Sequence, residues 1–292
     1  MVLGHGEVTL RKDRALVREL RYRIVDRIRG VDAIGRLARL RQQQFEDPES
    51  LAQQTRAARD LYFRALRDSV PMFRNVSRFE DLPIVDKAFV NAHREVLMNP
   101  HYQGKLIRKK TGGSTGEPFV YYTSPEAQSQ LWAGIFLSWE AAGFHLGDRV
   151  AFLAGSALFG SGWKQRVYYR MLNVTPFSAF DMSDETLARY ARDLAEGQFR
   201  LLYGYASAVH RLAHHLLANP SSVPRFALRG VVCTAEVLTS SMRAEIEAAF
   251  GAPCFNQYGC QDAGVSAFEC DQHTGLHLIS TRSYTEAQPG GQ

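Results

Sequence analysis

Between residues 105 and 258 the chain alternates short apolar runs with longer amphipathic stretches. The apolar runs have the length and composition of buried strands, at 149–153, 175–180, 200–203, 230–233 and 253–258. The stretches between them have the period of helices, at 164–172, 183–195, 208–218 and 240–250. Strands that alternate with helices form βαβ units. The sequence therefore predicts an α/β fold, with mixed or largely parallel sheets flanked by helices.

Short strands are also expected on either side of this region. Residues 105–111 and 118–122 have strand character and enclose a glycine-rich turn. Ser124 and Pro125 then begin a helix, because serine caps a helix N-terminus and proline is tolerated at the first helical position. Residues 265–285 have no helical period and are expected to form short strands around a turn at Thr274 and Gly275.

The N-terminal segment is basic and helical. Residues 11–44 are expected to form two helices, because Gly30 and Gly35 interrupt the pattern. Apolar residues recur there at four-residue spacing with arginines between them, at Leu16, Leu20, Ile24 and Ile28. We expect this stripe to pack on the body of the protein; the alternatives are a membrane surface and an acidic partner. Residues 1–47 are therefore treated as a helical segment, and residues 48–292 as the main domain.

Two further helices are expected in the first part of the main domain. One covers residues 48–70, and the other lies within residues 83–96, where Asp86 is a candidate N-cap.

Composition and charge exclude several classes of protein. Hydrophobic residues make up 45% and charged residues 22% of the chain, which excludes disordered, collagenous and disulfide-scaffold classes. The formal net charge is +5, and the first 44 residues hold eleven basic and five acidic side chains, so the rest is nearly neutral. This distribution argues against a nucleic-acid surface. Without an apolar run of eighteen residues or a signal-peptide pattern, we expect no membrane span and a cytoplasmic protein.

The glycine-rich turn between the first two strands has the composition of a phosphate-binding loop. It consists of Thr111, Gly112, Gly113, Ser114, Thr115 and Gly116, and it follows Lys109 and Lys110. Three glycines let backbone amides converge on an anion, and the hydroxyls and lysines add donors and positive charge. The loop is not a Walker motif, and the alternative is an ordinary hairpin turn.

Two acidic turns follow predicted strands further along the chain. Residues 230–236 end at Glu236, and residues 256–262 end at Asp262. Ligands of open α/β sheets bind beyond the carboxyl ends of the strands. Carboxylates there, together with the hydroxyl-rich loop, suit a nucleotide bound with Mg²⁺. The alternative for each carboxylate is a helix cap.

These motifs resemble the adenylate-forming (acyl-CoA synthetase) superfamily, in its phenylacetate-CoA ligase and CapK-like branch. Residues 111–118 are similar to its phosphate loop, Thr234-Ala235-Glu236 to its Ser-Gly-Glu turn, and residues 258–262 to its Tyr-Gly-x-x-Glu motif. Further similar segments occur in the family order, at 159–160, 164–166, 179–183, 203–208, 268–270 and 275–277.

The resemblance implies ATP-dependent activation of an organic, for example aromatic, carboxylic acid to an acyl-adenylate, followed by transfer to a thiol such as CoA. It assigns catalytic roles to Glu236 and Asp262, with Asp262 as the Mg²⁺ ligand and Tyr258 against adenine. It assigns cofactor contacts to the loop of residues 111–116 and to Ala235, Asn256, Gln257, Tyr258, Gly259 and Gln261. Asp262, Gln261 and Ala235 depart from the family's usual glutamate, threonine and glycine.

The substrate pocket is expected to be aromatic. Its candidate residues are Phe159, Trp163, Tyr203, Gly204 and Tyr205, although aromatic side chains at these positions suit a core equally well.

The C-terminal lid of the family, with its lysine, and the aspartate that binds ribose are not found before Gln292. We therefore expect nucleotide binding with incomplete catalysis. The alternative is a non-catalytic nucleotide-binding module, or a split subunit whose partner supplies the lid. A nucleic-acid or membrane-surface protein is the weakest interpretation.

Cysteine and histidine cluster near the C-terminus in a spacing that suggests zinc. The best four ligands are Cys254, Cys260, Cys270 and His277, with His273 as an alternative. Some members of the branch have a structural zinc beside the nucleotide site. The competing interpretation is three buried thiols and two surface histidines.

Overall fold

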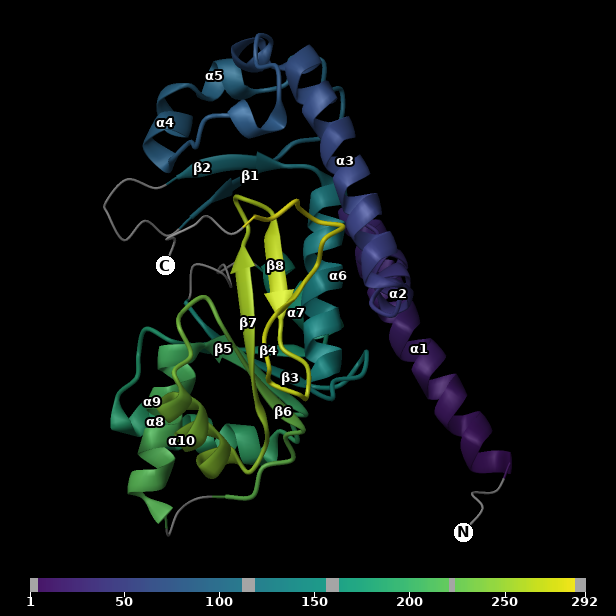
Figure 1. Ribbon diagram of the computed structural model, residues 1–292. Coiled ribbons are helices and arrows are strands. Elements are labelled where there is room, and N and C mark those ends of the chain that lie inside the picture. Colours follow the sequence, from purple (N-terminus) through teal and green to yellow (C-terminus); the bar gives the residue numbers. More distant parts are fainter. Residues whose placement is uncertain (1–4, 112–118, 156–162, 221–223, 287–292) are drawn as a thin grey trace.

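The computed structural model describes residues 5–111, 119–155, 163–220 and 224–286 (Figure 1). Its centre is a seven-stranded sheet in the order β4-β3-β5-β6-β7-β8-β9. Five neighbouring strands are parallel: β4 (Val174–Ser178), β3 (Val150–Ala154), β5 (Leu201–Tyr205), β6 (Gly230–Thr234) and β7 (Cys254–Cys260). The last two, β8 (Val265–Phe268) and β9 (His277–Leu278), are antiparallel. The predicted α/β fold with a largely parallel sheet is confirmed.

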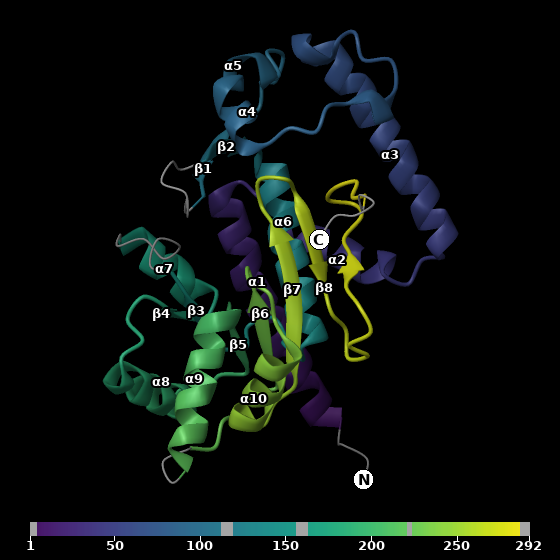
Figure 2. The ribbon, with the colours of Figure 1, turned by 60° about the vertical axis from the view of Figure 1, so that its left-hand side comes forward.

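Helices cover both faces of this sheet (Figures 1 and 2). One face packs on α6 (Pro125–Ala141) and α7 (Trp163–Met171), and the other on α8 (Asp184–Glu196), α9 (Ala206–Ala218) and α10 (Ser240–Phe250). The sequence explains this division, because successive strand side chains point to opposite faces. Val150 and Leu201 join the α6 core, whereas Ala151 and Leu202 join the α9 core.

The chain before the sheet forms an arm of helices and a hairpin, seen in the upper part of Figure 1. It contains α3 (Pro48–Ser69), α4 (Lys87–Ala92), α5 (Arg94–Leu97) and the antiparallel pair β1 (Ile107–Lys110) and β2 (Val120–Thr123), with two 3₁₀ turns at Pro71–Phe73 and Phe79–Asp81. The expected caps are present, since Asp86 accepts from the Phe89 amide and Ser124 from the Ala127 amide. Proline occupies the start of α6, as predicted.

The N-terminal helices α1 (His5–Arg29) and α2 (Ala33–Gln43) pack on the main domain. Gly30 ends α1 with a φ of +67°, so the first predicted break is present. Gly35 instead lies inside α2, where its amide donates to the N-cap carboxylate of Asp32. A Cβ at Gly35 would approach that carboxylate to 2.4 Å, so glycine serves the cap and does not break the helix.

The predicted packing stripe of α1 is wrong for the three of its residues whose side chains the structure describes, and Leu16 lies outside those. Leu20, Ile24 and Ile28 are exposed, with 56%, 43% and 73% of their surface accessible. The buried face is carried by Tyr22 and Val25. The Tyr22 hydroxyl donates to the Leu172 carbonyl at 2.9 Å, and burial raises its pKa to about 12. A tyrosine with a buried hydrogen-bond partner therefore replaces the aliphatic stripe as the contact surface.

Among the described helices, none combines the length and the apolar composition that crossing a membrane requires.

Leucine truncation on the two N-terminal helices tests this packing. Leu37 of α2 is fully buried, so Leu37→Ala should lower the free energy of unfolding by about 2–5 kcal/mol. Leu20→Ala, a matched change on the exposed face of α1, should change it by less than about 0.5 kcal/mol. Urea unfolding of both variants measures the difference, and equal losses would contradict the assignment of the buried face.

Candidate functional site

A cavity of about 320 Å³ lies at the carboxyl ends of β5, β6 and β7. Strand β4 follows β3 in the chain and lies on one side of it, whereas the next strand, β5, lies on the other side of β3. The direction of strand addition therefore reverses between β3 and β5. Open α/β sheets bind their ligands at such a switch point. The cavity is lined from both strands, by Phe152 of β3 and by Tyr203 and Tyr205 of β5.

The walls of this cavity are aromatic. Tyr203 packs at 4.8 Å from Phe152 and at 5.2 Å from Trp139, measured between ring centroids. On the α6–α7 side, Trp132 and Tyr168 lie edge to face at 6.4 Å. Burial raises the pKa of both Tyr168 and Tyr203, which keeps their phenols neutral. Rings of this kind suit an apolar body such as the carbon skeleton of an acid.

Five of the predicted cofactor residues line the same cavity: Ala235, Gln257, Tyr258, Gly259 and Gln261. Gln257 is buried, and its side-chain Nε2 donates to Ser138 of α6 at 2.8 Å. Its Oε1 has no hydrogen-bond partner among the described residues. Gln261 accepts from the Tyr121 hydroxyl at 3.3 Å, which connects this turn to β2. The Gln257 side chain thus ties β7 to α6 beside the cavity.

Ala235 has a left-handed backbone, with a φ of +67°. Non-glycine residues adopt this conformation at a cost, which explains why the resembling family has glycine at the position. The turn between β6 and α10 therefore has the left-handed conformation that glycine adopts easily, although alanine occupies the position.

The two predicted catalytic carboxylates already have protein partners. Glu236 accepts from the Ser207 amide at 2.7 Å and so caps the first turn of α9. Asp262 accepts from the Cys260 thiol at 3.0 Å and lies 3.6 Å from the Lys87 ammonium. Burial alone would raise the pKa of Asp262, but the Cys260 hydrogen bond and the Lys87 charge outweigh it and hold the pKa below its usual value. Asp262 is thus an anion close to the predicted nucleotide turn.

Glu236 also lines a neighbouring cavity of about 640 Å³, which shares Tyr205 with the first. The predicted segment from Ala179 to Ser183 forms another part of its wall. Three segments of the resemblance therefore meet around the ends of β4, β5 and β6.

Some predicted site residues fall outside the described residues, namely Gly112, Gly113, Ser114, Thr115, Gly116 and Phe159. Others are described but do not line the cavity. Thr111 closes the hairpin, since its amide donates to the Phe119 carbonyl at 2.9 Å. Trp163 is 66% exposed at the start of α7, and Asn256 holds Glu269 through its backbone. Gly204 lies within β5, where a Cβ would approach the Leu153 carbonyl oxygen to 2.4 Å.

The predicted zinc site is not formed. Cys254 and Cys260 begin and end β7, and six residues of strand span about 20 Å, far more than two ligands of one zinc ion allow. The Cys254 sulfur instead lies 3.8 Å from Cys233 in the core. His277 packs against the Phe268 ring, and the described residues contain no group of three metal-ligating side chains that would hold an ion.

His273, the alternative ligand, belongs to a hydrogen-bonded cluster around Glu269. Glu269 accepts from the Asn256 amide at 2.7 Å, from Arg243 at 2.8 and 2.9 Å, and contacts His273 at 3.2 Å. Burial alone would raise the pKa of Glu269, but these partners outweigh it and lower the pKa below the usual value. The cluster joins α10, β7 and the segment after β8.

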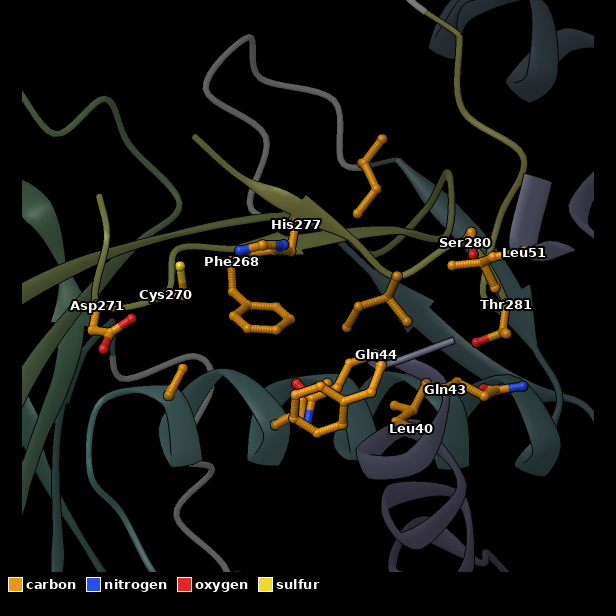
Figure 3. Close-up of a pocket in the computed structure, with 15 residues that line it drawn as sticks. Leu40, Gln43, Gln44, Leu51, Phe268, Cys270, Asp271, His277, Ser280 and Thr281 are labelled. Atoms are coloured by element: carbon orange, nitrogen blue, oxygen red, sulfur yellow. The ribbon is translucent and has the colours of Figure 1, made fainter. Parts of the chain in front are cut away.

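A separate cavity of about 540 Å³ lies between α2, α6 and the β8–β9 edge (Figure 3). Its walls carry Leu40, Phe268 and Leu278, and Cys270 and His277 lie at its rim. Although it is larger, it contains none of the residues predicted to bind nucleotide. We therefore assign the candidate site to the cavity at the strand ends.

Sequence reasoning missed the residues that α1, α6 and α7 contribute to the site. These are Arg29, Gln128, Trp132 and Tyr168, and they line the cavity together with Lys109. The lysine was noted only for its charge beside the glycine-rich turn. No local sequence pattern points to Arg29 as a site residue, because its partner Tyr168 lies 139 residues away in the chain.

Comparison with known proteins gives a consistent result. No family model matches the chain. The chain is 29% identical to Protein CapK of Staphylococcus aureus over 235 residues, which is 73% of this chain and 52% of that protein. The chain thus spans about half the length of the curated relative it matches.

One solved structure supports the fold. A structure of 2-hydroxyisobutyryl-CoA ligase in the postadenylation state matches with a TM-score of 0.51 at 17% identity, over 74% of this chain and 50% of that one. A second structure of that ligase matches with a TM-score of 0.49 at 18% identity, over 67% and 43%.

Replacing Ala235 by glycine tests the backbone of the β6 turn. The change relieves a left-handed alanine, worth about 1–2 kcal/mol, and adds about 0.5–1 kcal/mol of unfolded-chain entropy. Ala235→Gly should therefore leave stability unchanged or raise it by up to about 1 kcal/mol. Ala244→Gly, at an exposed position of α10, should lower it by about 1 kcal/mol. Equal losses in thermal unfolding would contradict the turn geometry.

The Glu269 cluster predicts a pH dependence of stability. Because the pKa of Glu269 is lowered in the folded state, its contribution is present above the ordinary pKa of about 4.3 and is lost as pH falls through the folded-state value. Glu269→Gln should therefore be less stable than wild type at pH 7, and the difference should shrink on acidification. Denaturant titrations from pH 7 to pH 3 measure it. Exposed Glu196→Gln is the control, and a difference that is constant with pH would refute the prediction.

Proposed function

We propose that this chain, a CapK-like member of the adenylate-forming superfamily, binds ATP and a small carboxylic acid and joins them as an acyl-adenylate. The observation that carries the proposal is the cavity at the sheet's switch point, because the residues of the predicted nucleotide motifs and the aromatic walls line one space. Protein CapK, the curated relative, supports membership of this branch. Transfer of the acyl group to a thiol such as CoA belongs to the same proposal.

In the proposed reaction, a carboxylate oxygen of the acid attacks the α-phosphorus of ATP. A new bond forms between that oxygen and phosphorus, the bond to the bridging oxygen of the β-phosphate breaks, and pyrophosphate leaves. The protein must hold the two reactants in line, since positioning supplies much of the acceleration in such a step. Tyr203, Phe152 and Trp132 would hold the carbon skeleton, and the turns at Ala235 and Tyr258 would hold the nucleotide.

The donor groups present fit Mg²⁺. This ion prefers oxygen ligands, usually one or two carboxylates together with phosphates of the substrate. Asp262 supplies an ionised carboxylate beside the predicted nucleotide turn. Asp262 would hold Mg²⁺, and the bound ion would neutralise negative charge on the phosphates. Lys87, now 3.6 Å from Asp262, would be free to contact phosphate.

The size of the cavity limits the acid. About 320 Å³ lies at the lower end of the range for small-molecule sites, roughly 300–1,000 Å³. A ring or a short carbon chain fits this space, whereas a long fatty acyl chain does not.

A second candidate function is a nucleotide-binding subunit without turnover of its own. It is favoured by the two carboxylates, since Glu236 caps α9 and Asp262 is bound by Cys260 and Lys87. In this case a partner would supply the groups that stabilise the developing charge.

Nucleotide binding by this chain tests the proposal. Isothermal titration with ATP and Mg²⁺ should show binding, and Asp262→Asn should weaken it about tenfold or more by removing a carboxylate from the ion. Asp271→Asn, at the rim of the other cavity, should leave it unchanged. Failure of the wild-type chain to bind ATP would refute the nucleotide site.

Exchange of labelled pyrophosphate into ATP then separates the two functions. Exchange that depends on an added carboxylic acid would support adenylation by this chain. Binding of ATP without exchange, for any acid in a panel of small aromatic and aliphatic acids, would favour the nucleotide-binding subunit.

A further inference from the structure

Two cationic side chains from different elements of the fold line the same aromatic cavity. Arg29 comes from the last turn of α1 and Lys109 from β1. The Arg29 guanidinium lies over the Tyr168 ring at 4.8 Å and over the Trp132 ring at 5.9 Å. Its Nη1 donates to the Tyr168 hydroxyl at 2.8 Å. Arg29 is therefore held in place by the α6–α7 wall of the cavity.

Neither cation has a carboxylate partner in the described part of the chain. Among the described residues no ion pair within 4.0 Å involves Arg29 or Lys109, and the described lining of the cavity contains no aspartate or glutamate. Asp26, the acidic residue one turn before Arg29, interacts with the Arg29 charge at longer range, and its Oδ2 accepts from the Ile34 amide at 2.9 Å.

The two cations also repel each other across the cavity. Burial and the positive charge of Arg29 lower the pKa of Lys109. Burial raises the pKa of the neighbouring Tyr168 phenol, and the positive charge of Arg29 offsets only part of this rise. Two like charges that line one cavity, with no carboxylate in its described lining, are stabilised by an anionic ligand placed between them.

We propose that the acid bound in this cavity carries a second anionic group, a carboxylate or a phosphate, and that Arg29 and Lys109 bind this group. The inference rests on the proposed function for the identity of the other, reacting carboxylate. That carboxylate would face the turns at Ala235 and Tyr258, where the predicted nucleotide motif lies. The second anion would face the α6–α7 wall. The substrate class is thus a small diacid or phosphorylated acid with a ring or short chain between its charges.

The aromatic setting argues for an anion on the acid and against a phosphate of the nucleotide. The guanidinium stacks on Trp132 and Tyr168, the rings that would enclose the carbon skeleton of the acid. Lys110, next to Lys109 along β1, is exposed and lies on the other side of the strand. The strand therefore directs one lysine to the cavity and the next away from it.

Direct binding of matched acids, without ATP, tests the inference. The probes are benzoate against terephthalate and butanoate against succinate, each measured by isothermal titration calorimetry on the whole chain. Within at least one pair the diacid should bind about tenfold or more tightly, because charge-assisted hydrogen bonds to a half-buried guanidinium are stronger than neutral ones. Arg29→Met, which keeps the apolar stem, should remove this preference. Arg27→Met, an exposed position on the same helix, should retain it.

Several outcomes would overturn the inference. These are equal or undetectable binding of both members of both pairs, and a diacid preference that survives Arg29→Met. If Arg29→Met weakens ATP binding instead of diacid binding, Arg29 contacts the nucleotide. That result also overturns the inference. Lys109→Met provides a second variant in case Arg29→Met does not fold. Circular dichroism of both variants checks that they are folded.

The inference and the proposed function fail separately. A chain that binds diacids through Arg29 but no ATP keeps the anion site and loses the adenylation proposal. A chain that binds ATP and shows no diacid preference keeps the proposed function and loses the anion site.

Discussion

Burial of α6 from two sides is the constraint on which the rest of the structure depends. The helix packs against the sheet on one side and against α2 on the other, and most of its residues from Gln128 to Trp139 are buried. Two serines fix its position. Ser138 accepts from Gln257 of β7 at 2.8 Å, and Ser129 accepts from the Asp32 amide at the α1–α2 junction, also at 2.8 Å. A helix held this way sets the distance between the sheet and the N-terminal helices.

The candidate site follows from that distance. Its floor is formed by strand ends, its wall by Trp132 of α6, and its far edge by Arg29 of α1. Arg29 reaches the cavity because the described part of α1 is anchored to the main domain. Asp148, buried just before β3, lies 2.7 Å from Arg229 and 3.7 Å from Arg18 of α1. Helix α1 thereby contributes to the construction of the site.

The sequence was sufficient for the parts of the fold that local patterns determine. Strands, helices and caps such as Ser124 and Asp86 were predicted because alternation of apolar residues and capping chemistry act over a few residues. The two turns that end at Glu236 and Asp262 were predicted to lie near one another because parallel strands end at one edge of the sheet. The contacts of Gln257, Tyr258 and Ala235 came from the resemblance to the adenylate-forming family, and all three residues line the cavity.

The failures share a different cause. The stripe on α1 was chosen by apolarity alone, whereas the contact is made by Tyr22, whose hydroxyl bonds a carbonyl 150 residues away. The zinc ligands were chosen by spacing, which does not reveal that one strand separates Cys254 from Cys260. Arg29 was missed because its cavity exists only after α1, α6 and α7 have packed. Long-range packing thus decided each case.

We propose that the cavity at the switch point of the sheet holds the acid and that the turns at Ala235 and Tyr258 hold the nucleotide. A crystal structure of the chain with AMP and terephthalate tests this most directly. We expect the diacid between Tyr203 and Trp132 with one carboxylate on the Arg29 guanidinium, and AMP against the turns at Ala235 and Tyr258. Ligands bound in the cavity between Leu40 and Phe268, or a diacid away from Arg29, would contradict it.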